Sequence, residues 1–388
     1  MKIGIDQIGF YTPQYFVDMN DLAESRGVEP AKFTIGIGQS EMAVAPLTQD
    51  SVTLAANAAL TFLDDEMRES IDLVLFGTET GIDQSKSAGI YVHDLLDIQP
   101  YARTVEMKQA CYSATAALQL AKGHIALNPN SKVLVLASDI ARYGLSTAGE
   151  VTQGAGAVAM LISANPRILS LENDSAYITK DIMDFWRPNY SPYAYVDGKY
   201  SNDQYIAFFN EVWEQYKGKA NRSLDDFAAL CFHLPYTKMG LKALRTILDE
   251  TSDANQDRLQ QLYEHSTTYG RKIGNIYTAS LYLGLVSLLE NSETLQAGDR
   301  VGLFSYGSGA VGEFFTGILE EGYEEALQKD THRNIFVQRE KVSVAQYEEM
   351  FTERLPEDGS EIMLSNENDP APAYVSGMKD HMRLYTRK

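Results

Sequence analysis

Glu106-Met-Lys-Gln-Ala-Cys-Tyr-Ser-Ala-Thr-Ala-Ala-Leu118 places a cysteine directly before a run of small residues that predicts a buried helix. The N-terminus of a helix carries partial positive charge and free N–H groups, so it favours a thiolate and can hold an oxyanion. On this stretch alone, Cys111 is either a covalent nucleophile or a buried structural cysteine that packs as a small apolar side chain. The helix terminus lowers the pKa of the thiol by at most about 1.5 units, so activation also needs a nearby imidazole or another proton acceptor.

Short apolar runs on both sides of this segment predict buried strands, and periodic segments between them predict helices. The expected strands are 1–10, 71–77, 132–138, 227–233 and 300–305, and the expected helices are 114–127 and 278–289. This alternation favours an α/β fold with buried sheets. Beyond about residue 315 the chain is rich in Glu, and we expect surface helices over 320–325 and 340–361, an irregular tail and a peripheral appendage.

The two halves of the chain repeat one order of elements, which is strand, turn with helix, strand, and glycine-rich hairpin. The helix after Cys111 and the hairpin 154–156 belong to the first half, and the helix after Asn275 and the hairpin 307–309 belong to the second. Because 388 residues exceed one ordinary core, we interpret this as a duplication with domains 1–165 and 166–388. A pseudo-twofold arrangement would then bring Cys111 and Asn275 to one cleft.

Composition excludes several classes of protein. A formal net charge of −20 argues against nucleic acid or an anionic membrane as the main partner, and no window approaches the 18 or so apolar residues of a membrane span. Two cysteines and an N-terminus without a signal-peptide pattern favour a reducing cytoplasm. No metal site is expected, because the two cysteines are far apart and no His-x-x-x-His pattern occurs.

Two further side chains stand at the ends of expected strands, where α/β proteins place their sites. Glu79 follows the strand 71–77 in a loop of Gly and Thr, and partial burial there would raise its pKa and suit it to proton transfer. His233 ends the strand 227–233 and precedes Pro235. The alternatives are a solvated loop carboxylate for Glu79 and a hydrogen-bonded core histidine for His233.

The second half contributes an amide and a basic helix face. Asn275 begins an expected helix, either as a ligand contact or as an N-cap. The turns 307–309 and 154–156 bring backbone N–H groups close to a ligand or are purely structural. Lys238, Lys242 and Arg245 fall on one helix face, which is either solvated or recognises phosphate.

Cys, His and Asn at these places resemble the thiolase superfamily of condensing enzymes, and the surrounding motifs resemble the bacterial type of hydroxymethylglutaryl-CoA synthase over essentially the whole chain. These motifs are Gly77-Thr-Glu-Thr80, Ala110-Cys-Tyr112, Gln153-Gly-Ala-Gly-Ala-Val-Ala159, Phe232-His-Leu-Pro-Tyr-Thr-Lys238, Gly274-Asn-Ile-Tyr-Thr278 and Phe304-Ser-Tyr-Gly-Ser-Gly309. The resemblance implies a duplicated αβαβα thiolase-like fold. It also implies condensation of acetyl-CoA with acetoacetyl-CoA and water, in the mevalonate route to isoprenoids.

The resemblance further implies a role for individual residues. Cys111 accepts the acetyl group, Glu79 is the acid/base, and His233 positions and polarises acetoacetyl-CoA. The remaining implied contacts are Asn275 and Ser308 to the substrate thioester, Thr152 and Ser201 to the glutaryl part of the product, and Lys238, Lys242 and Pro30 to CoA. The family implies a homodimer and no cofactor, since the CoA thioesters are substrates.

Three positions depart from the bacterial pattern without removing a chemical group. Val151 replaces a common Pro before Thr152, Ala279 replaces a common Gly, and Tyr200 replaces a common Leu. Two other functions are compatible with a Cys, His and Asn set. One is an initiating ketoacyl-acyl-carrier-protein synthase, which decarboxylates and does not need Glu79, and the other is an inactive scaffold with the thiolase fold.

Overall fold

The computed structural model describes residues 1–388, and its largest sheet contains ten strands, nine of which follow one another in a path of hydrogen-bonded neighbours. Each expected strand is present, within a few residues of its expected ends. In spatial order the path is β12 (Ala229–Phe232), β13 (Arg300–Gly307), β14 (Val311–Leu319), β8 (Leu169–Leu171), β1 (Ile3–Tyr11), β7 (Gly154–Ala164), β6 (Lys132–Ala141), β4 (Ile71–Gly77) and β5 (Arg103–Met107), and β9 (Ala176–Thr179) pairs with β14.

The two halves of the chain meet where β1 pairs with β8 over only two residues, Gly4 opposite Ser170 and Ile5 opposite Leu169. A Cβ atom on Gly4 would lie 1.9 Å from the carbonyl oxygen of Leu169, so this close approach requires glycine. On one side of the join β4 and β6 are parallel and β6 and β7 antiparallel, and on the other β12 and β13 are parallel and β13 and β14 antiparallel. The repeated pairing matches the expected repeat of elements.

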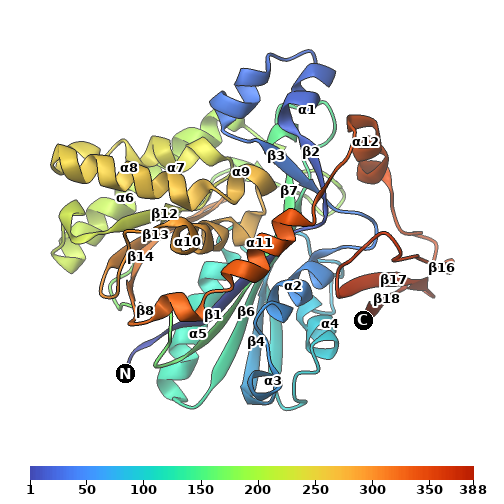
Figure 1. The fold of residues 1–388 in the computed structure, drawn as a ribbon, viewed down its shortest axis with the longest axis horizontal. Helices are drawn as coiled ribbons and strands as arrows, with labels where there is room; N and C mark the ends of the chain where they lie inside the picture. Colours follow the sequence, from blue (N-terminus) through green and yellow to red (C-terminus); the bar gives the residue numbers. More distant parts are fainter.

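Alternating side chains on these strands build layers (Figure 1). On β6, Val135 packs into a central cluster with α5 (Ser113–Leu127) and α10 (Ser280–Asn291), whereas Leu134 packs into an outer cluster with helices of the first half. On β12, Cys231 faces the same central cluster, whereas Leu230 faces helices of the second half. The outer helices are α2 (Ser51–Leu60) and α4 (Ala88–Leu95) on one side, and α6 (Gly198–Ala220), α7 (Thr237–Leu244) and α8 (Asp253–Thr267) on the other. The expected αβαβα layering is therefore confirmed.

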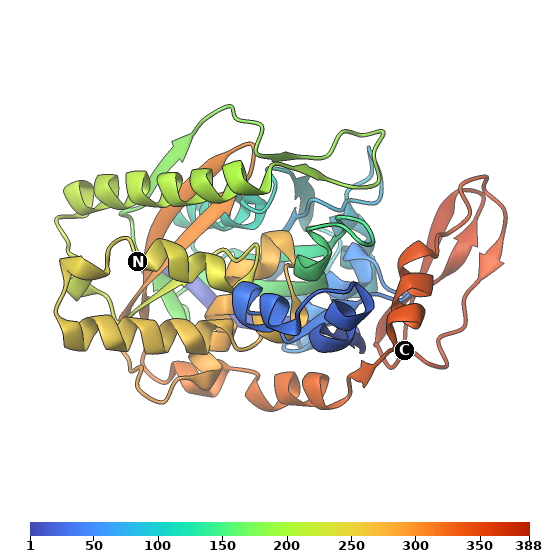
Figure 2. The same cartoon turned by 90° about the horizontal axis from the view of Figure 1, so that it is seen from above.

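Smaller elements surround this core, and none of the helices combines the length and the apolar character that crossing a membrane requires. A three-stranded sheet forms from β15 (Glu340–Lys341), β2 (Tyr15–Asp18) and β3 (Glu41–Val44). The C-terminal hairpin of β17 (Ala373–Lys379) and β18 (Met382–Arg387), with β16 (Ile362–Met363), extends from one end of the molecule (Figure 2). This hairpin is the expected appendage.

The expected helices of the C-terminal region need correction. Residues 320–325 form only a turn that ends in a short 3₁₀ segment (Tyr323–Ala326), and 340–361 contains one helix of nine residues, α12 (Val344–Thr352). Between them lies an unexpected helix, α11 (Lys329–Val337), whose His332 is fully buried. The Nε2 atom of His332 accepts the Phe10 N–H at 3.1 Å and its Nδ1 lies 2.7 Å from Glu290, so a tertiary contact rather than local pattern fixes this helix.

Candidate active site

Glu79 lies just past the C-terminal end of β4, in a loop fixed by the buried carboxylate of Asp139. Asp139 Oδ1 accepts the main-chain N–H groups of Glu79 at 2.8 Å and Thr80 at 3.0 Å. The other oxygen, Oδ2, accepts the N–H of Thr278 at 3.1 Å and its hydroxyl at 2.6 Å. One carboxylate therefore joins the Glu79 loop of the first half to the loop after Asn275 in the second.

Asp139 was missed by the sequence analysis, although one signal was available. It occupies the end of the apolar strand β6, and β6 is a parallel neighbour of β4, so the carboxyl ends of the two strands meet. Its partners lie about 60 and 139 residues away along the chain. No local pattern could identify them.

Cys111 lies in the turn between β5 and α5, with its Sγ atom 2.9 Å from Oε1 of Glu79. Ser113 holds this turn, because its hydroxyl accepts the Gln109 N–H at 2.6 Å and donates to the Ala110 carbonyl at 2.8 Å. A Cβ atom on Gly77 would lie 2.8 Å from the nitrogen of Ala114, so glycine lets the start of α5 pack against the end of β4. These contacts bring the Cys111 thiol and the Glu79 carboxyl group together.

Burial governs the ionisation of this pair. It raises the pKa of Glu79 to about 8, and the Asp139 charge adds to this, whereas the Cys111 hydrogen bond and Arg187 oppose it. Burial and the Glu79 carboxylate together raise the pKa of the Cys111 thiol well above its usual value. The expectation of a helix start that favours the thiolate is therefore wrong, because desolvation and the neighbouring carboxylate outweigh the main-chain N–H. The hydrogen-bond acceptor of the thiol is Glu79 Oε1.

His233 directly follows β12 and is 2% exposed. Its main-chain N–H donates to Phe304 at 2.8 Å and its carbonyl accepts the Tyr205 hydroxyl at 2.6 Å, so the residue is fixed through its backbone. The Nδ1 atom has no hydrogen-bond partner in the protein. Burial lowers the pKa of His233 to about 3, so the imidazole is uncharged. A core histidine would have a protein partner for each buried ring nitrogen, and the free Nδ1 favours the functional interpretation instead.

Asn275 is not a helix N-cap, because α10 begins only at Ser280. Its side-chain oxygen accepts the Tyr277 N–H at 2.8 Å and the Ser280 hydroxyl at 2.9 Å, and its main-chain N–H donates to the Thr152 carbonyl at 3.0 Å. Gly274 precedes it with φ of 93°, and a Cβ atom there would lie 1.9 Å from the Gln153 oxygen. This loop therefore lies directly against the Thr152 loop.

Tyr143 connects the two halves of the site. Its hydroxyl is 3.5 Å from Nδ2 of Asn275, and its pKa is raised by burial first and then by the charges of Cys111 and Glu79. The ring packs edge-on against Tyr277 at 6.1 Å between centroids. Tyr143 thus contacts Asn275 of the second half and feels the charges of Cys111 and Glu79 of the first.

Ser308, expected at the substrate thioester, and Ser201, expected at the glutaryl part of the product, belong to the same neighbourhood. Ser308 accepts a hydrogen bond at its carbonyl from Nε2 of Gln109 at 3.2 Å, two residues before Cys111. The Ser201 hydroxyl donates to Asp184 at 3.2 Å, and Asp184 also accepts the Gly309 N–H at 2.8 Å. Because the Gly309 N–H donates to Asp184, this N–H of the 307–309 turn is not available to a ligand.

The glycine-rich segment 154–156 is not a hairpin. It opens strand β7, and the connection from β6 is the longer segment 142–153. A Cβ atom on Gly154 would lie 2.7 Å from the main-chain oxygen of Asn275, so glycine here permits the close approach of the Asn275 loop of the second half. Val151 is buried in a cluster with Tyr347, which accommodates the departure from proline beside Thr152.

The expected CoA contacts come from the outer helix α7 of the second half and from the Pro30 segment of the first half. Lys242 is exposed on α7 and Lys238 is partly buried, and the side chain of Lys238 lies close to Gly38, where a Cβ atom would be 3.2 Å from its Cγ. Pro30 precedes the short helical segment Lys32–Ile37, whose end leads to Gly38. The predicted basic face and the Pro30 segment are thus neighbours.

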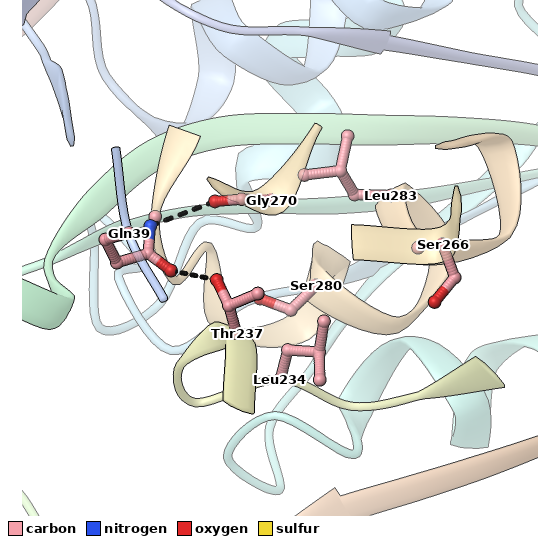
Figure 3. A pocket seen from close by; sticks show the side chains of 9 residues that line it. Gln39, Leu234, Thr237, Ser266, Gly270, Ser280 and Leu283 are labelled. Carbon is pink, nitrogen blue, oxygen red and sulfur yellow. Dashed lines mark hydrogen bonds between the residues drawn. The ribbon is translucent and has the colours of Figure 1, made fainter. Parts of the chain in front are cut away.

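A cavity of about 10 Å³ separates the start of α7 from α10 and is lined in part by Gln39, Thr237 and Ser280 (Figure 3). Gln39 donates to the Gly270 carbonyl at 3.0 Å and accepts the Thr237 hydroxyl. A space of this size holds about one water molecule, so it is not a substrate pocket. The cavity lies beside the Asn275 loop, because the hydroxyl of its lining residue Ser280 donates a hydrogen bond to the Asn275 side chain. No group of three or more His, Cys, Asp or Glu side chains is arranged to hold a metal ion.

The five-layered fold has a Cys–Glu pair and an Asn at the junction of its halves and a buried, uncharged His just past the end of β12, and together these features define a condensing enzyme of the thiolase class. Models of the hydroxymethylglutaryl-coenzyme A synthase N-terminal and C-terminal regions match residues 1–167 and, in two overlapping segments, 171–271 and 248–358. The hydroxymethylglutaryl-CoA synthase of Enterococcus faecalis is 53% identical over 385 residues, covering 99% of this chain and 100% of that relative. The chain belongs to the hydroxymethylglutaryl-CoA synthase family.

Solved structures agree over the whole chain. A crystal structure of a hydroxymethylglutaryl-CoA synthase complexed with CoA superposes with a TM-score of 0.97 at 48% identity, covering 100% of both chains. MvaS in complex with 3-hydroxy-3-methylglutaryl coenzyme A superposes with a TM-score of 0.89 at 34% identity, covering 100% of this chain and 99% of that one. The protein has hydroxymethylglutaryl-CoA synthase activity (EC 2.3.3.10) of the bacterial type, in the mevalonate pathway.

Proposed function

We propose that Cys111 and Glu79 carry out this activity as a nucleophile and acid/base pair, and the observation that carries the proposal is their contact of 2.9 Å. In the first step the thioester bond of acetyl-CoA breaks and a bond forms between the acetyl group and Cys111 Sγ. The thiol proton passes by way of Glu79 to the departing CoA thiolate. Burial keeps the resting thiol protonated, so proton removal and bond formation are coupled.

In the second step Glu79 removes a proton from the methyl group of acetyl-Cys111, and the resulting enolate carbon attacks the ketone carbon of acetoacetyl-CoA. A carboxyl group with a pKa near 8 is basic enough to take this proton and acidic enough to return one near neutral pH. His233 is uncharged and donates an N–H hydrogen bond to the ketone oxygen. The proton that Glu79 took from the methyl group then passes to the alkoxide formed on this oxygen, which gives the 3-hydroxyl group and restores the Glu79 carboxylate. Water then hydrolyses the thioester to Cys111 and releases 3-hydroxy-3-methylglutaryl-CoA.

We assign acetyl-CoA and acetoacetyl-CoA as the substrates, and the remaining residues as their contacts. Asn275 and Ser308 contact the substrate thioester, which is supported by the contact of Ser308 with Gln109 near Cys111. The other assigned contacts are Thr152 and Ser201 for the glutaryl part, and Pro30, Lys238 and Lys242 for CoA. The relative crystallised with CoA and the relative crystallised with 3-hydroxy-3-methylglutaryl coenzyme A support these assignments.

We further propose a cytoplasmic homodimer of chains with domains 1–165 and 166–388. β5 is the last strand of the path and leaves one side unpaired, and its Val105 is 48% exposed. An unpaired edge strand with exposed apolar side chains is suited to association with a second copy. Light scattering coupled to size-exclusion chromatography measures the mass directly, and a monomer at micromolar concentration would refute the dimer.

The proposed roles separate in a single-turnover experiment with Glu79→Ala. Acetylation of Cys111 from acetyl-CoA is followed by mass spectrometry, and product formation after adding acetoacetyl-CoA is followed in the same sample. We expect acetyl-Cys111 to accumulate while carbon–carbon bond formation is lost. Unimpaired condensation by Glu79→Ala would instead favour a reaction that does not need this carboxylate.

A further inference from the structure

The segment from Asp184 to Val196 forms a flap beside the catalytic pair. Its two short strands, β10 (Phe185–Trp186) and β11 (Tyr195–Val196), pair antiparallel with each other and with no other strand. Asp184 fixes the start of the flap, because its carboxylate accepts the Tyr306 hydroxyl and the Gly309 N–H, both at 2.8 Å. Only the first residue of the flap is therefore anchored by buried hydrogen bonds to the core strands.

The flap presents one aromatic ring and one cation to the site. The Phe185 ring packs edge-on against Tyr143 and Tyr277, with centroids 6.1 and 5.9 Å away. The Arg187 guanidinium donates a hydrogen bond from Nη2 to the main-chain oxygen of Glu79. Arg187 forms no ion pair with an acidic side chain, so no carboxylate neutralises its positive charge beside the Glu79 loop.

The Arg187 charge matters because the other groups around Glu79 raise its pKa or are neutral. The Asp139 carboxyl group on β6 raises the pKa of Glu79, whereas Arg187 lowers it. Burial raises the pKa of Cys111, Tyr143 and Tyr277, so these neighbours stay protonated near neutral pH and add no charge. A flap that moves away removes the cation and leaves Asp139 in place.

We propose that Arg187 is a positioning residue for the acid/base step, bringing a positive charge to the Glu79 loop when the flap is closed and so favouring the carboxylate form of Glu79. Glu79 then becomes the better base when the site is shut over the acetyl group. With the flap open, Asp139 favours the protonated form of Glu79. This inference rests on the proposed role of Glu79 and adds the residue that adjusts it.

The test is the pH dependence of kcat/KM for condensation in Arg187→Gln and Arg187→Lys, measured from pH 6 to 10. Loss of the cation should move the ascending limb of the kcat/KM profile to a pH higher by roughly 0.5 to 1 unit. At a fixed pH below that limb, kcat/KM should therefore be about 3- to 10-fold lower than in the wild type. Arg187→Lys should restore the limb, because lysine keeps the charge. Arg187→Met is a second neutral variant.

Lys199→Gln is the matched control, since it removes an equal charge from an exposed residue at the start of α6 that bonds no catalytic group. A wild-type pH profile in both neutral Arg187 variants would overturn the inference, as would an equal shift in Arg187→Lys. Glu79→Gln, measured in parallel, separates the proposed role of Glu79 from that of Arg187. If Glu79→Gln also retains wild-type condensation, the proposed role of Glu79 has failed; if it is inactive while Arg187→Gln is unchanged, only the Arg187 inference has failed.

Discussion

Replacing Glu79 by Gln should lower the pKa of the Cys111 thiol, because the change removes the negative charge beside the sulfur atom. The Cys111 Sγ and Glu79 Oε1 atoms are 2.9 Å apart. Above pH 8 the wild-type carboxyl group is ionised and opposes formation of the thiolate. Gln has nearly the same shape without the charge, so only burial continues to hold the thiol pKa high.

The size of the effect follows from the separation of the two charges. At 2.9 Å, with an effective dielectric constant of about 20, the repulsion between a thiolate and a carboxylate is roughly 6 kcal/mol. This corresponds to about 4 pKa units at the most, since relaxation of the loop and entry of water reduce it. We therefore expect the thiol pKa to fall by at least about 1 unit in Glu79→Gln.

The assay is the rate of Cys111 alkylation by iodoacetamide between pH 7 and 10, followed by peptide mass spectrometry, which separates Cys111 from the buried Cys231. At pH 9 to 10, Glu79→Gln should react at least about tenfold faster than the wild type, because alkylation requires the thiolate. Glu106→Gln is the control. It removes a half-buried carboxylate that bonds the Ala88 N–H instead of the thiol. Equal or slower alkylation in Glu79→Gln, with the fold intact by circular dichroism, would refute the reasoning.

Three further outcomes are expected. The pKa of Glu79 is raised from 4.5 to about 8 in the folded protein, so its stabilisation is complete below pH 4.5 and is lost as pH rises through 8. Between pH 6 and 9 the wild type should therefore lose about 2 to 3 kcal/mol of unfolding free energy relative to Glu79→Gln, and parallel urea curves would contradict this. Lys238→Ala with Lys242→Ala should raise KM for acetyl-CoA roughly tenfold at unchanged kcat; an unchanged KM at low salt would remove these residues from the CoA site. His332→Phe leaves the Phe10 N–H and a buried carboxylate without their partner, and should lower the unfolding free energy by about 3 to 5 kcal/mol, whereas a loss below 1 kcal/mol in urea would contradict that role for α11.

The layers of the fold were predictable because they depend on local pattern. Strands such as β4 and β6 are apolar on both faces, since each is covered by helices on two sides, and this produces the apolar runs 73–77 and 133–137. α11 was missed because it contains no Glu, whereas the expectation of surface helices rested on Glu-rich composition, and α12 occupies only part of the expected range 340–361. The buried contact of His332 with Phe10 joins residues 322 positions apart.

In the site, too, features that depend on local sequence were predictable and features that depend on long-range contacts were not. The Cys111 turn and the Asn275 loop could be located, because a turn rich in small residues before a helix is visible in sequence. The sign of the thiol pKa shift could not be predicted, because it depends on the burial of Cys111 beside Glu79. Asp139 was missed for the related reason that its role lies in long-range hydrogen bonds.

The central claim is that condensation proceeds through acetyl-Cys111, and one measurement tests it most directly. Purified protein is incubated with acetyl-CoA and acetoacetyl-CoA, and its products are identified by mass spectrometry beside those of Cys111→Ser. The account predicts 3-hydroxy-3-methylglutaryl-CoA and acetyl-Cys111 from the wild type, and neither from Cys111→Ser. Acetyl-Cys111 without condensed product, or product formed by Cys111→Ser, would contradict it.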